Sequence, residues 1–233
     1  AAGVDNASEI DAVTSATKNK TRAGKLAAGS YHVNADGTDI TGVSFPVKVL
    51  TPWALKNAKQ VTDADSCDIT VTLKGKESTT TYTGVDALFE NESYAYYKLS
   101  ETPAYYITAW YNLLSGKWEF GKVHATETTV EGTTVELNTN GHHTTYEMKI
   151  SGFDLDYKAN KVYGVVLSVR GVSLPPADGS EYGLHHVTNI WHGTKLGFNA
   201  DDPYFASIIG KTITQITFYA ADGVYVLPVN VAL

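Results

Sequence analysis

The sequence has few cysteines, few basic residues and no long apolar run, and each shortage argues against a class of protein. Cys67 is the single cysteine, so an internal disulfide and a cysteine-based zinc site are both impossible. Lysine and arginine number 18 against 25 acidic residues, and the net charge of −7 argues against nucleic acid and against an anionic membrane surface as partners. No apolar run approaches the roughly 18 residues that a membrane-spanning helix needs.

The residues that are present favour an ordered β-rich protein. The chain contains 15 tyrosines and 4 tryptophans, with 43% hydrophobic and 18% charged residues, among many threonines and valines. It starts "AAGVDNAS" without an initiator methionine, from which we expect a secreted or surface-attached bacterial protein that has lost a signal peptide or lipid-anchored leader. Membrane attachment would then be only through that removed N-terminal anchor. A tagged cytoplasmic fragment is the alternative.

The length allows one large β domain or two small ones, and the pattern favours two. We predict a mainly β fold of two β-sandwich or barrel-like lobes with one or two short helices. Residues 1–28 form a polar leader of loop or short helix, 29–137 an N-terminal β lobe with an aromatic hairpin, and 138–233 a C-terminal β lobe with one short helix. The turn-rich "NTNGHH" supplies the boundary between the lobes.

Three segments predict particular strands. Residues 104–125 contain two aromatic-rich runs around Ser115-Gly116, which indicates a β-hairpin. The nearly unbroken apolar residues from Val162 to Val169 are typical of a strand covered on both faces. A second hairpin is expected over Asp222-Gly223.

In "GLHHVTNIWHG" apolar residues recur at helical spacing, which predicts a helix over residues 184–191 that ends at Gly193. His185, Asn189 and His192 share one face of that helix, and a turn further back carries His142. We therefore take His142, His185 and His192 as candidate ligands of a metal or haem. The alternative is that they are polar surface or capping residues.

Ser15 and Lys18 have the S-x-x-K spacing of penicillin-recognising serine enzymes. In such enzymes the serine begins a helix, and the lysine one turn on helps to remove its proton. The sequence contains no S-D-N, and its nearest approach to K-T-G is Lys211-Thr212-Ile213. Ser15 as nucleophile with Lys18 as base is thus a candidate catalytic pair whose companion motifs are missing.

The same region approaches a flavin-attachment signature. "DAVTSAT" would place a phosphoester-linked flavin on Thr17. Ser15 stands where that signature has glycine, which permits close approach of the backbone. Thr17 is therefore a candidate cofactor-binding residue, and the sequence identifies no cofactor beyond this.

Aromatic residues cluster along the first predicted hairpin. Strand alternation puts Tyr106 and Trp110 on one face and Tyr105 and Tyr111 on the other, so that one face is core and the other is free to bind a sugar or peptide. Ordinary cross-strand packing is the alternative. We expect the ligand surface where the hairpin meets the histidine helix, formed by Tyr106, Trp110, Trp118, His185 and His192.

Two segments resemble the treponemal penicillin-binding lipoprotein family, a β-rich group of bacterial surface proteins. "DAVTSATKNKTRAG" is similar to that family's "DAVSxAT" segment and "ADGSEYGLHHVTNIW" to its "ADGSELxHxxF" segment, with "NTNG" as a third similar patch. The resemblance implies an envelope lipoprotein of β domains that binds penicillin without the usual serine-enzyme motifs. It implies no role for any numbered residue.

Together these patterns predict an extracytoplasmic cell-envelope protein, more a ligand-binding or interaction module than an enzyme. The expected partner is a cell-wall glycan or peptide. A serine acyl-enzyme and a metal or haem carrier are the alternative functions.

Overall fold

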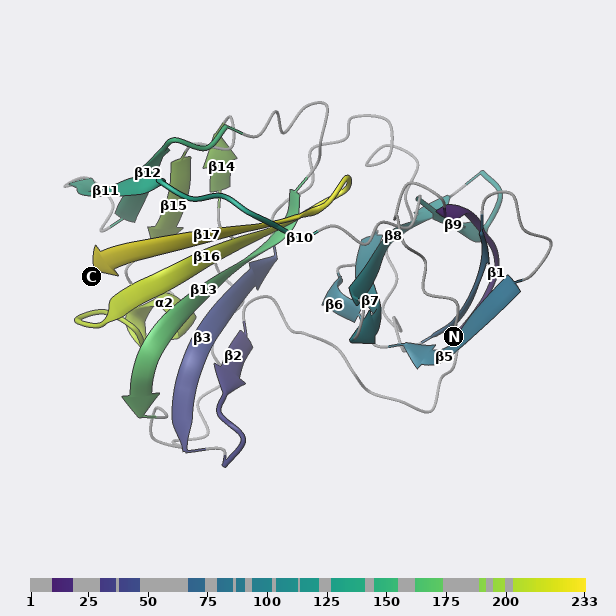
Figure 1. Ribbon diagram of the computed structural model, residues 1–233, viewed down its shortest axis with the longest axis horizontal. Helices are drawn as coiled ribbons and strands as arrows, with labels where there is room; N and C mark the ends of the chain where they lie inside the picture. Colours follow the sequence, from purple (N-terminus) through teal and green to yellow (C-terminus); the bar gives the residue numbers. More distant parts are fainter. Residues whose placement is uncertain are drawn as a thin grey trace. The chain divides into compact units, whose positions relative to one another are not determined.

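The computed structural model describes residues 10–18, 30–36, 38–46, 67–73, 79–85, 87–90, 94–101, 104–112, 114–121, 127–140, 145–154, 162–173, 189–191, 195–199 and 203–233. Within these ranges most residues lie in β-strands, and α2 (Pro203–Ala206) is a single short helix (Figure 1). The predicted mainly β class is confirmed.

The chain forms two compact units whose sequences interleave. Unit 1 contains Ala1–Ala27, Leu50–Glu127 and Ala221–Gly223, and unit 2 contains Ala28–Val49, Thr128–Ala220 and Val224–Leu233. This division differs from the predicted lobes of residues 29–137 and 138–233. The physical reason is long-range strand pairing, because the strand over residues 39–46 pairs with a strand that follows residue 161, and the strand over residues 30–33 pairs with the former.

The predicted polar leader also needs correction. Residues 10–18 form strand β1 (Ile10–Lys18), which pairs antiparallel with β4 (Cys67–Leu73). The register of this pair shifts twice within β1, and such bulges disrupt the period-2 alternation by which a strand is recognised in a sequence. This strand is therefore recognised from its pairing with β4 and not from its sequence pattern.

Unit 1 contains two antiparallel sheets. The order of the first is β1-β4-β5, with β5 at Thr79–Val85. The order of the second is β6-β7-β8-β9. Its strands are β6 (Ala87–Glu90), β7 (Tyr94–Glu101), β8 (Ala104–Asn112) and β9 (Lys117–Phe120). Ile69 of the first sheet packs with Tyr97, Tyr105 and Ile107 of the second, so one apolar core joins the two sheets.

A β-bulge lies just before the chain passes from the first sheet of unit 1 to the second. Cys67 pairs with Val85 but Ile69 pairs with Tyr82, which leaves one extra residue on β5. Gly84 lies in this bulge with φ 60°, and its N–H donates to Asp68 Oδ1 at 2.7 Å. Bulges of this kind bend a strand, which allows one nearly continuous segment to supply β5 to one sheet and β6 to the other.

Unit 2 is built from two further antiparallel sheets (Figure 1). The larger has the order β10-β17-β16-β13-β3-β2 and the smaller has the order β11-β12-β15-β14. The larger contains β10 (Glu127–Thr129), β17 (Val224–Ala232), β16 (Thr212–Ala220), β13 (Val162–Ser173), β3 (Asp39–Pro46) and β2 (Ser30–Val33). The smaller contains β11 (Thr134–Asn140), β12 (Thr145–Ser151), β15 (Lys195–Asn199) and β14 (Asn189–Trp191).

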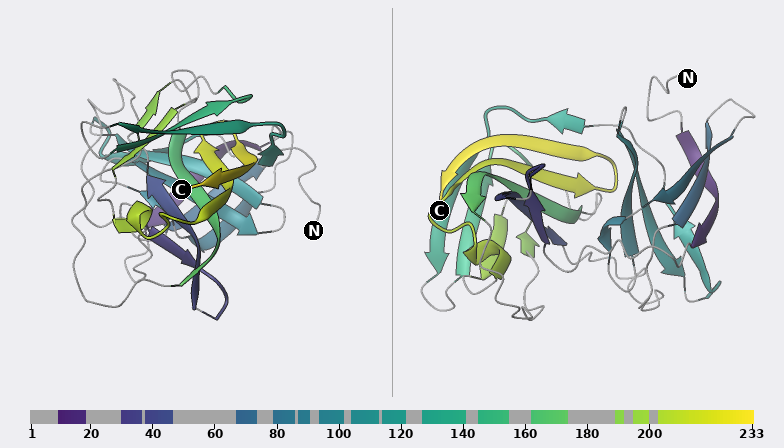
Figure 2. Two further views of the ribbon diagram at one scale, coloured as in Figure 1. Left: turned by 90° about the vertical axis from the view of Figure 1, so that its left-hand side faces the viewer. Right: turned by 90° about the horizontal axis from the view of Figure 1, so that it is seen from below.

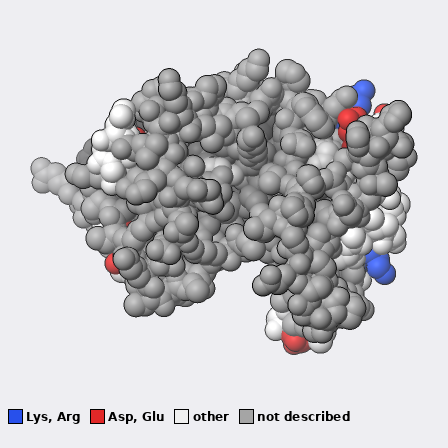
Figure 3. All heavy atoms as spheres, turned by 180° about the vertical axis from the view of Figure 1, so that it is seen from behind, with Lys and Arg blue, Asp and Glu red and all other residues white. Residues whose placement is uncertain are grey.

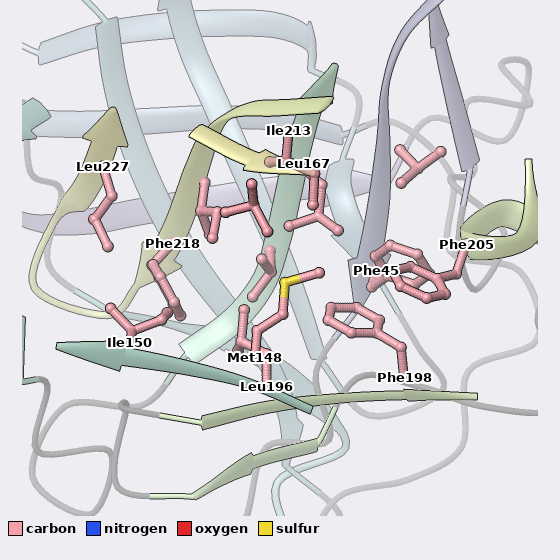
Figure 4. Packing of buried hydrophobic residues seen from close by; sticks show 14 of the residues in the cluster. Phe45, Met148, Ile150, Leu167, Leu196, Phe198, Phe205, Ile213, Phe218 and Leu227 are labelled. Atoms are coloured by element: carbon pink, nitrogen blue, oxygen red, sulfur yellow. The ribbon is translucent and has the colours of Figure 1, made fainter. Parts of the chain in front are cut away.

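An aromatic stack packs inside unit 2 beside α2 (Figure 4). Phe198 and Phe205 stack with ring centroids 4.8 Å apart, and Phe45 meets Phe198 edge-on at 5.0 Å. Met148 and Ile150 of β12 belong to the same buried cluster. Each such side chain contributes about 1.5–3 kcal/mol of burial, and aromatic pairs add about 0.5–1.5 kcal/mol, so this cluster holds the two sheets and α2 together.

The strands predicted from the clearest patterns are confirmed. β13 lies between β3 and β16, and Val162, Tyr163, Val165 and Leu167 on it are all buried. The hairpin over Asp222-Gly223 joins β16 and β17, which Figure 2 shows as two long neighbouring arrows. The hairpin around Ser115-Gly116 joins β8 and β9, and Gly116 has φ 65° in its turn.

Gly42 lets β3 and β13 approach closely. It pairs with Ser168, and a Cβ atom at this position would lie 2.7 Å from the backbone oxygen of Leu167. This distance is shorter than van der Waals contact, and a backbone oxygen in a central strand cannot rotate away. Glycine is therefore required by the packing of these two strands.

We expect Gly42→Ala to lower the free energy of unfolding of unit 2 by about 1–3 kcal/mol, the range for overpacking. Gly171→Ala is the matched control, because Gly171 is exposed on β13 and a Cβ there has no neighbour within 4 Å among the described residues. Urea unfolding followed by circular dichroism compares the two variants. Equal stabilities would contradict this account of Gly42.

Candidate functional site

The two faces of the β8 strand are settled by the core. Tyr105, Ile107 and Ala109 belong to the buried cluster of unit 1. Tyr106 and Trp110 alternate with them and therefore lie on the opposite face. This opposite face is the one on which the sequence predicts a ligand platform.

Tyr106 is not part of an exposed platform. Its side chain is only 1% exposed, and its ring lies 5.9 Å from that of Tyr96, which is also buried. Its hydroxyl donates a hydrogen bond to Glu127 Oε1 at 2.5 Å. Tyr106 is thus a packing and anchoring residue, and the predicted ligand contact at this position is not supported by its burial.

Trp118 does not lie beside Trp110. Trp110 pairs with Glu119 across the β8–β9 hairpin, whereas Trp118 pairs with Tyr111. Neighbouring positions of a strand alternate between its faces, so Trp110 and Trp118 occupy positions on opposite faces of the sheet. The three aromatic residues predicted as one ligand surface therefore do not form one.

Trp110 is instead bonded to Glu119 near the end of the hairpin, and Asn112 binds the same carboxylate. The Nε1–H of Trp110 donates to Glu119 Oε2 at 2.8 Å, and the Nδ2 of Asn112 donates to Glu119 Oε1 at 2.7 Å. Both carboxylate oxygens therefore accept an N–H, and charge-assisted bonds of this kind are about twice as strong as neutral ones. We call these three side chains the Trp110 network. All three are partly exposed.

Asn112 also fixes the hairpin turn. Its Oδ1 accepts the backbone N–H groups of Leu114 and Ser115 at 2.8 and 3.4 Å, and its carbonyl oxygen accepts that of Gly116 at 2.8 Å. Leu114 extends from this turn with 79% of its surface exposed. The turn therefore presents an apolar side chain in a fixed position, next to the partly exposed Trp110 network.

The groups of this surface are of the kinds that contact ligands in binding sites. An indole ring offers an apolar face for a sugar or peptide, and carboxylate and amide groups beside it offer hydrogen bonds. Among the residues of the network, Glu119 is the single carboxylate, whereas glycoside hydrolysis uses two. The arrangement is suited to binding.

The serine-enzyme and flavin candidates lie on β1. Ser15 pairs with Thr70, Thr17 with Asp68 and Lys18 with Cys67 along an uninterrupted stretch of strand. Residues three apart in a strand occupy opposite faces, so Ser15 and Lys18 lack the shared helical face that the S-x-x-K mechanism needs. The predicted geometry is therefore wrong, while the reactivity of Ser15 and Thr17 stays a prediction.

The predicted histidine site lies largely outside the described residues. His142, His185 and His192 all fall there, as does the first part of the helix predicted over residues 184–191. Its last three residues form β14, which pairs with β15, and the helix is wrong for that part. No group of three metal-ligating side chains occurs in the ranges that the structure describes.

His32 on β2 is a polar feature that the sequence patterns did not indicate. Its Nε2 is buried and has no hydrogen-bond partner among the described residues. Burial lowers the pKa of the imidazole below its ordinary value, because the charged form loses hydration. His32 pairs with Gly42 and Gly42 with Ser168, so neither strand neighbour supplies an acidic side chain.

On the face shown in Figure 3, the described acidic and basic side chains form no large patch of one sign. In the described part of the chain, no helix has the length and apolarity to cross a membrane.

No protein-family model matches the chain, and no curated protein or solved structure is significantly similar to it. The resemblance of residues 11–24 and 177–191 to treponemal penicillin-binding lipoproteins therefore stays a prediction.

For His32 we expect a pH-dependent stability of the sheet that contains it. Because its folded-state pKa is lowered, the unfolded chain binds more protons once the pH falls below the ordinary histidine value of about 6.5, and the free energy of unfolding declines. Urea unfolding at pH 7.5 and 5.5 should show a larger loss for the wild type than for His32→Gln, since other titrating groups are common to both. Equal losses would contradict the assignment.

For the Trp110 network we expect Glu119→Gln to weaken or break the hydrogen bond of the Trp110 indole, because the acceptor loses its charge in either orientation of the amide. The amide replaces one acceptor oxygen by a donor, so one of the two N–H groups loses its partner, at a cost of about 1 kcal/mol. The indole N–H resonance of Trp110 should shift and exchange faster with water. Glu131→Gln makes the same change at an exposed position of unit 2 and should leave that resonance unmoved. An unchanged resonance in Glu119→Gln would refute the network.

Proposed function

We propose that the protein is a non-catalytic binding module of the bacterial cell surface whose β8–β9 hairpin contacts a cell-wall glycan or peptide. The observation that carries this proposal is an exposed Leu114 whose backbone N–H binds Asn112, together with a partly exposed Trp110 whose indole N–H binds Glu119. Aromatic side chains that are rigid before binding lose little conformational entropy in a complex. Apolar anchors of this kind dominate the energy of recognition surfaces.

The envelope location rests on composition and on the lipoprotein-like segments. The chain is rich in tyrosine and threonine and is acidic, with a net charge of −7. This charge also favours neutral sugars and peptides over polyanionic partners.

We expect purified protein to bind insoluble peptidoglycan, with binding weakened by about tenfold or more in Trp110→Ala and by less in Leu114→Ala, because hot-spot truncations cost about 2 kcal/mol or more. Sedimentation with cell-wall sacculi measures this, and calorimetry with soluble glycan and peptide fragments distinguishes the two ligand classes. Ile209→Ala is the matched control, because Ile209 is an exposed apolar side chain of unit 2. Unchanged binding in Trp110→Ala would overturn the proposal.

Mass spectrometry distinguishes the two covalent alternatives, an acyl-enzyme on Ser15 and a flavin on Thr17. Intact mass spectrometry of the folded protein should show the mass of the unmodified chain, before and after incubation with a β-lactam. An adduct that disappears in Ser15→Ala would favour the acyl-enzyme function, and a modification present before incubation on Thr17 would favour a covalent flavin.

A further inference from the structure

Glu119 carries a charge that its own hydrogen bonds do not neutralise. The indole N–H of Trp110 and the side-chain amide of Asn112 each donate to one of its carboxylate oxygens, and both donors are neutral groups. Glu119 is only partly exposed, so water hydrates its charge incompletely. Each carboxylate oxygen has a second lone pair that can accept a further donor. The carboxylate is therefore suited to a cation that binds from solution.

Trp110 offers the matching aromatic surface. It lies in a row across the sheet between Tyr94 on β7, which is 5% exposed, and Glu119 on β9. Trp110 itself is partly exposed, so the row passes from the interior to solvent at this ring. An indole whose N–H donates to a carboxylate is polarised by it, and its ring becomes more electron-rich. Tryptophan is also the aromatic side chain that attracts cations most strongly.

Asn112 brings an apolar side chain close to the same carboxylate. Its Oδ1 accepts the backbone N–H of Leu114 at 2.8 Å, while its Nδ2 donates to Glu119. One side-chain amide thus separates the backbone of Leu114 from the carboxylate, and Leu114 is 79% exposed. Lysine and arginine combine an apolar stem with a charged head. Such a side chain can lie along Leu114 with its head at Glu119.

We infer that the β8–β9 hairpin binds a cationic side chain of a peptide, with its ammonium or guanidinium group on the Trp110 ring and paired with Glu119. The inference rests on the proposed function and narrows its ligand from a glycan or peptide to a peptide that carries positive charge. The net charge of −7 on the chain favours the approach of such a ligand. An uncharged sugar would leave the carboxylate without a counter-charge.

Two peptides that differ by one acetyl group test the charge. Wild-type protein should bind a short lysine-containing peptide about fivefold more tightly than the same peptide with that lysine acetylated, because acetylation removes the cation. Titration followed through the indole N–H resonance of Trp110 measures both affinities. Glu119→Gln should bind the two peptides equally. Glu131→Gln is the matched change at an exposed position of unit 2 and should keep the preference.

The preference between the two peptides isolates the charge, because a merely displaced Trp110 ring would weaken both peptides alike. Lys117 lies two positions before Glu119 on β9 and is a cation that would compete for the same carboxylate. Lys117→Gln should therefore tighten binding of the lysine peptide. Equal affinities for the two peptides in the wild type, an undiminished preference in Glu119→Gln, or weaker binding in Lys117→Gln would each overturn the inference. So would an amino-sugar oligomer of equal charge that binds as tightly as the peptide.

Cell-wall sacculi separate this inference from the proposed function. Acetylation of their free amino groups should release wild-type protein if it binds a cation. Binding that is lost in Trp110→Ala but unchanged by acetylation would retain the proposed function and overturn the inference. No binding to untreated sacculi would overturn the cell-wall ligand, and the peptide pair then decides the inference alone.

Discussion

The pairing of β3 with β13 is the constraint on which the architecture of this protein depends. It joins two segments that are far apart in the sequence, and all of β4 to β9 lies between them. Because β3 also carries Phe45 into the aromatic stack, this one pairing closes the larger sheet and completes the core of unit 2. At Gly42 the two strands lie so close that there is no room for a Cβ atom.

Unit 1 follows a similar plan on a smaller scale. β1 joins β4 from a separate part of the sequence, and the bulge at Gly84 turns the chain from one sheet into the other. Asp68 serves this bulge by accepting a hydrogen bond from the backbone N–H of Gly84. On one face of β7 and β8, Tyr97 and Tyr105 belong to the core, and on the other face the buried Tyr106 packs against Tyr96.

Local patterns predict the strands whose alternation is intact. The hairpins at Ser115-Gly116 and Asp222-Gly223 and the buried run of β13 could all be read from the sequence. β1 could not, because its two register shifts break the alternation, and β14 could not, because a strand of three residues is too short to oppose the helical spacing around it. The division into units could not be predicted from the sequence either. Paired residues such as Val43 and Leu167 are far apart in the chain, and no local pattern indicates that they pair.

The candidate site shows the same limit. Alternation correctly separates Tyr106 and Trp110 from Tyr105, but it cannot tell which positions on a face are covered, and Tyr106 is buried while Trp110 is partly exposed. The bonds from Trp110 and Asn112 to Glu119 depend on the β8–β9 register. An Asn at the start of a tight turn, followed by an exposed leucine, was the signal that could have indicated them.

The interleaved order of the two units has a consequence for synthesis of the chain. β3 leaves the ribosome well before β13, its partner in the larger sheet. At typical elongation rates the delay is on the order of ten seconds, which is long compared with the collapse of a small domain. During that interval unit 1 can acquire all of its principal strands while β3 still has an unsatisfied edge, so a chaperone that shelters residues 39–46 in the nascent chain would act where this fold is most exposed to error.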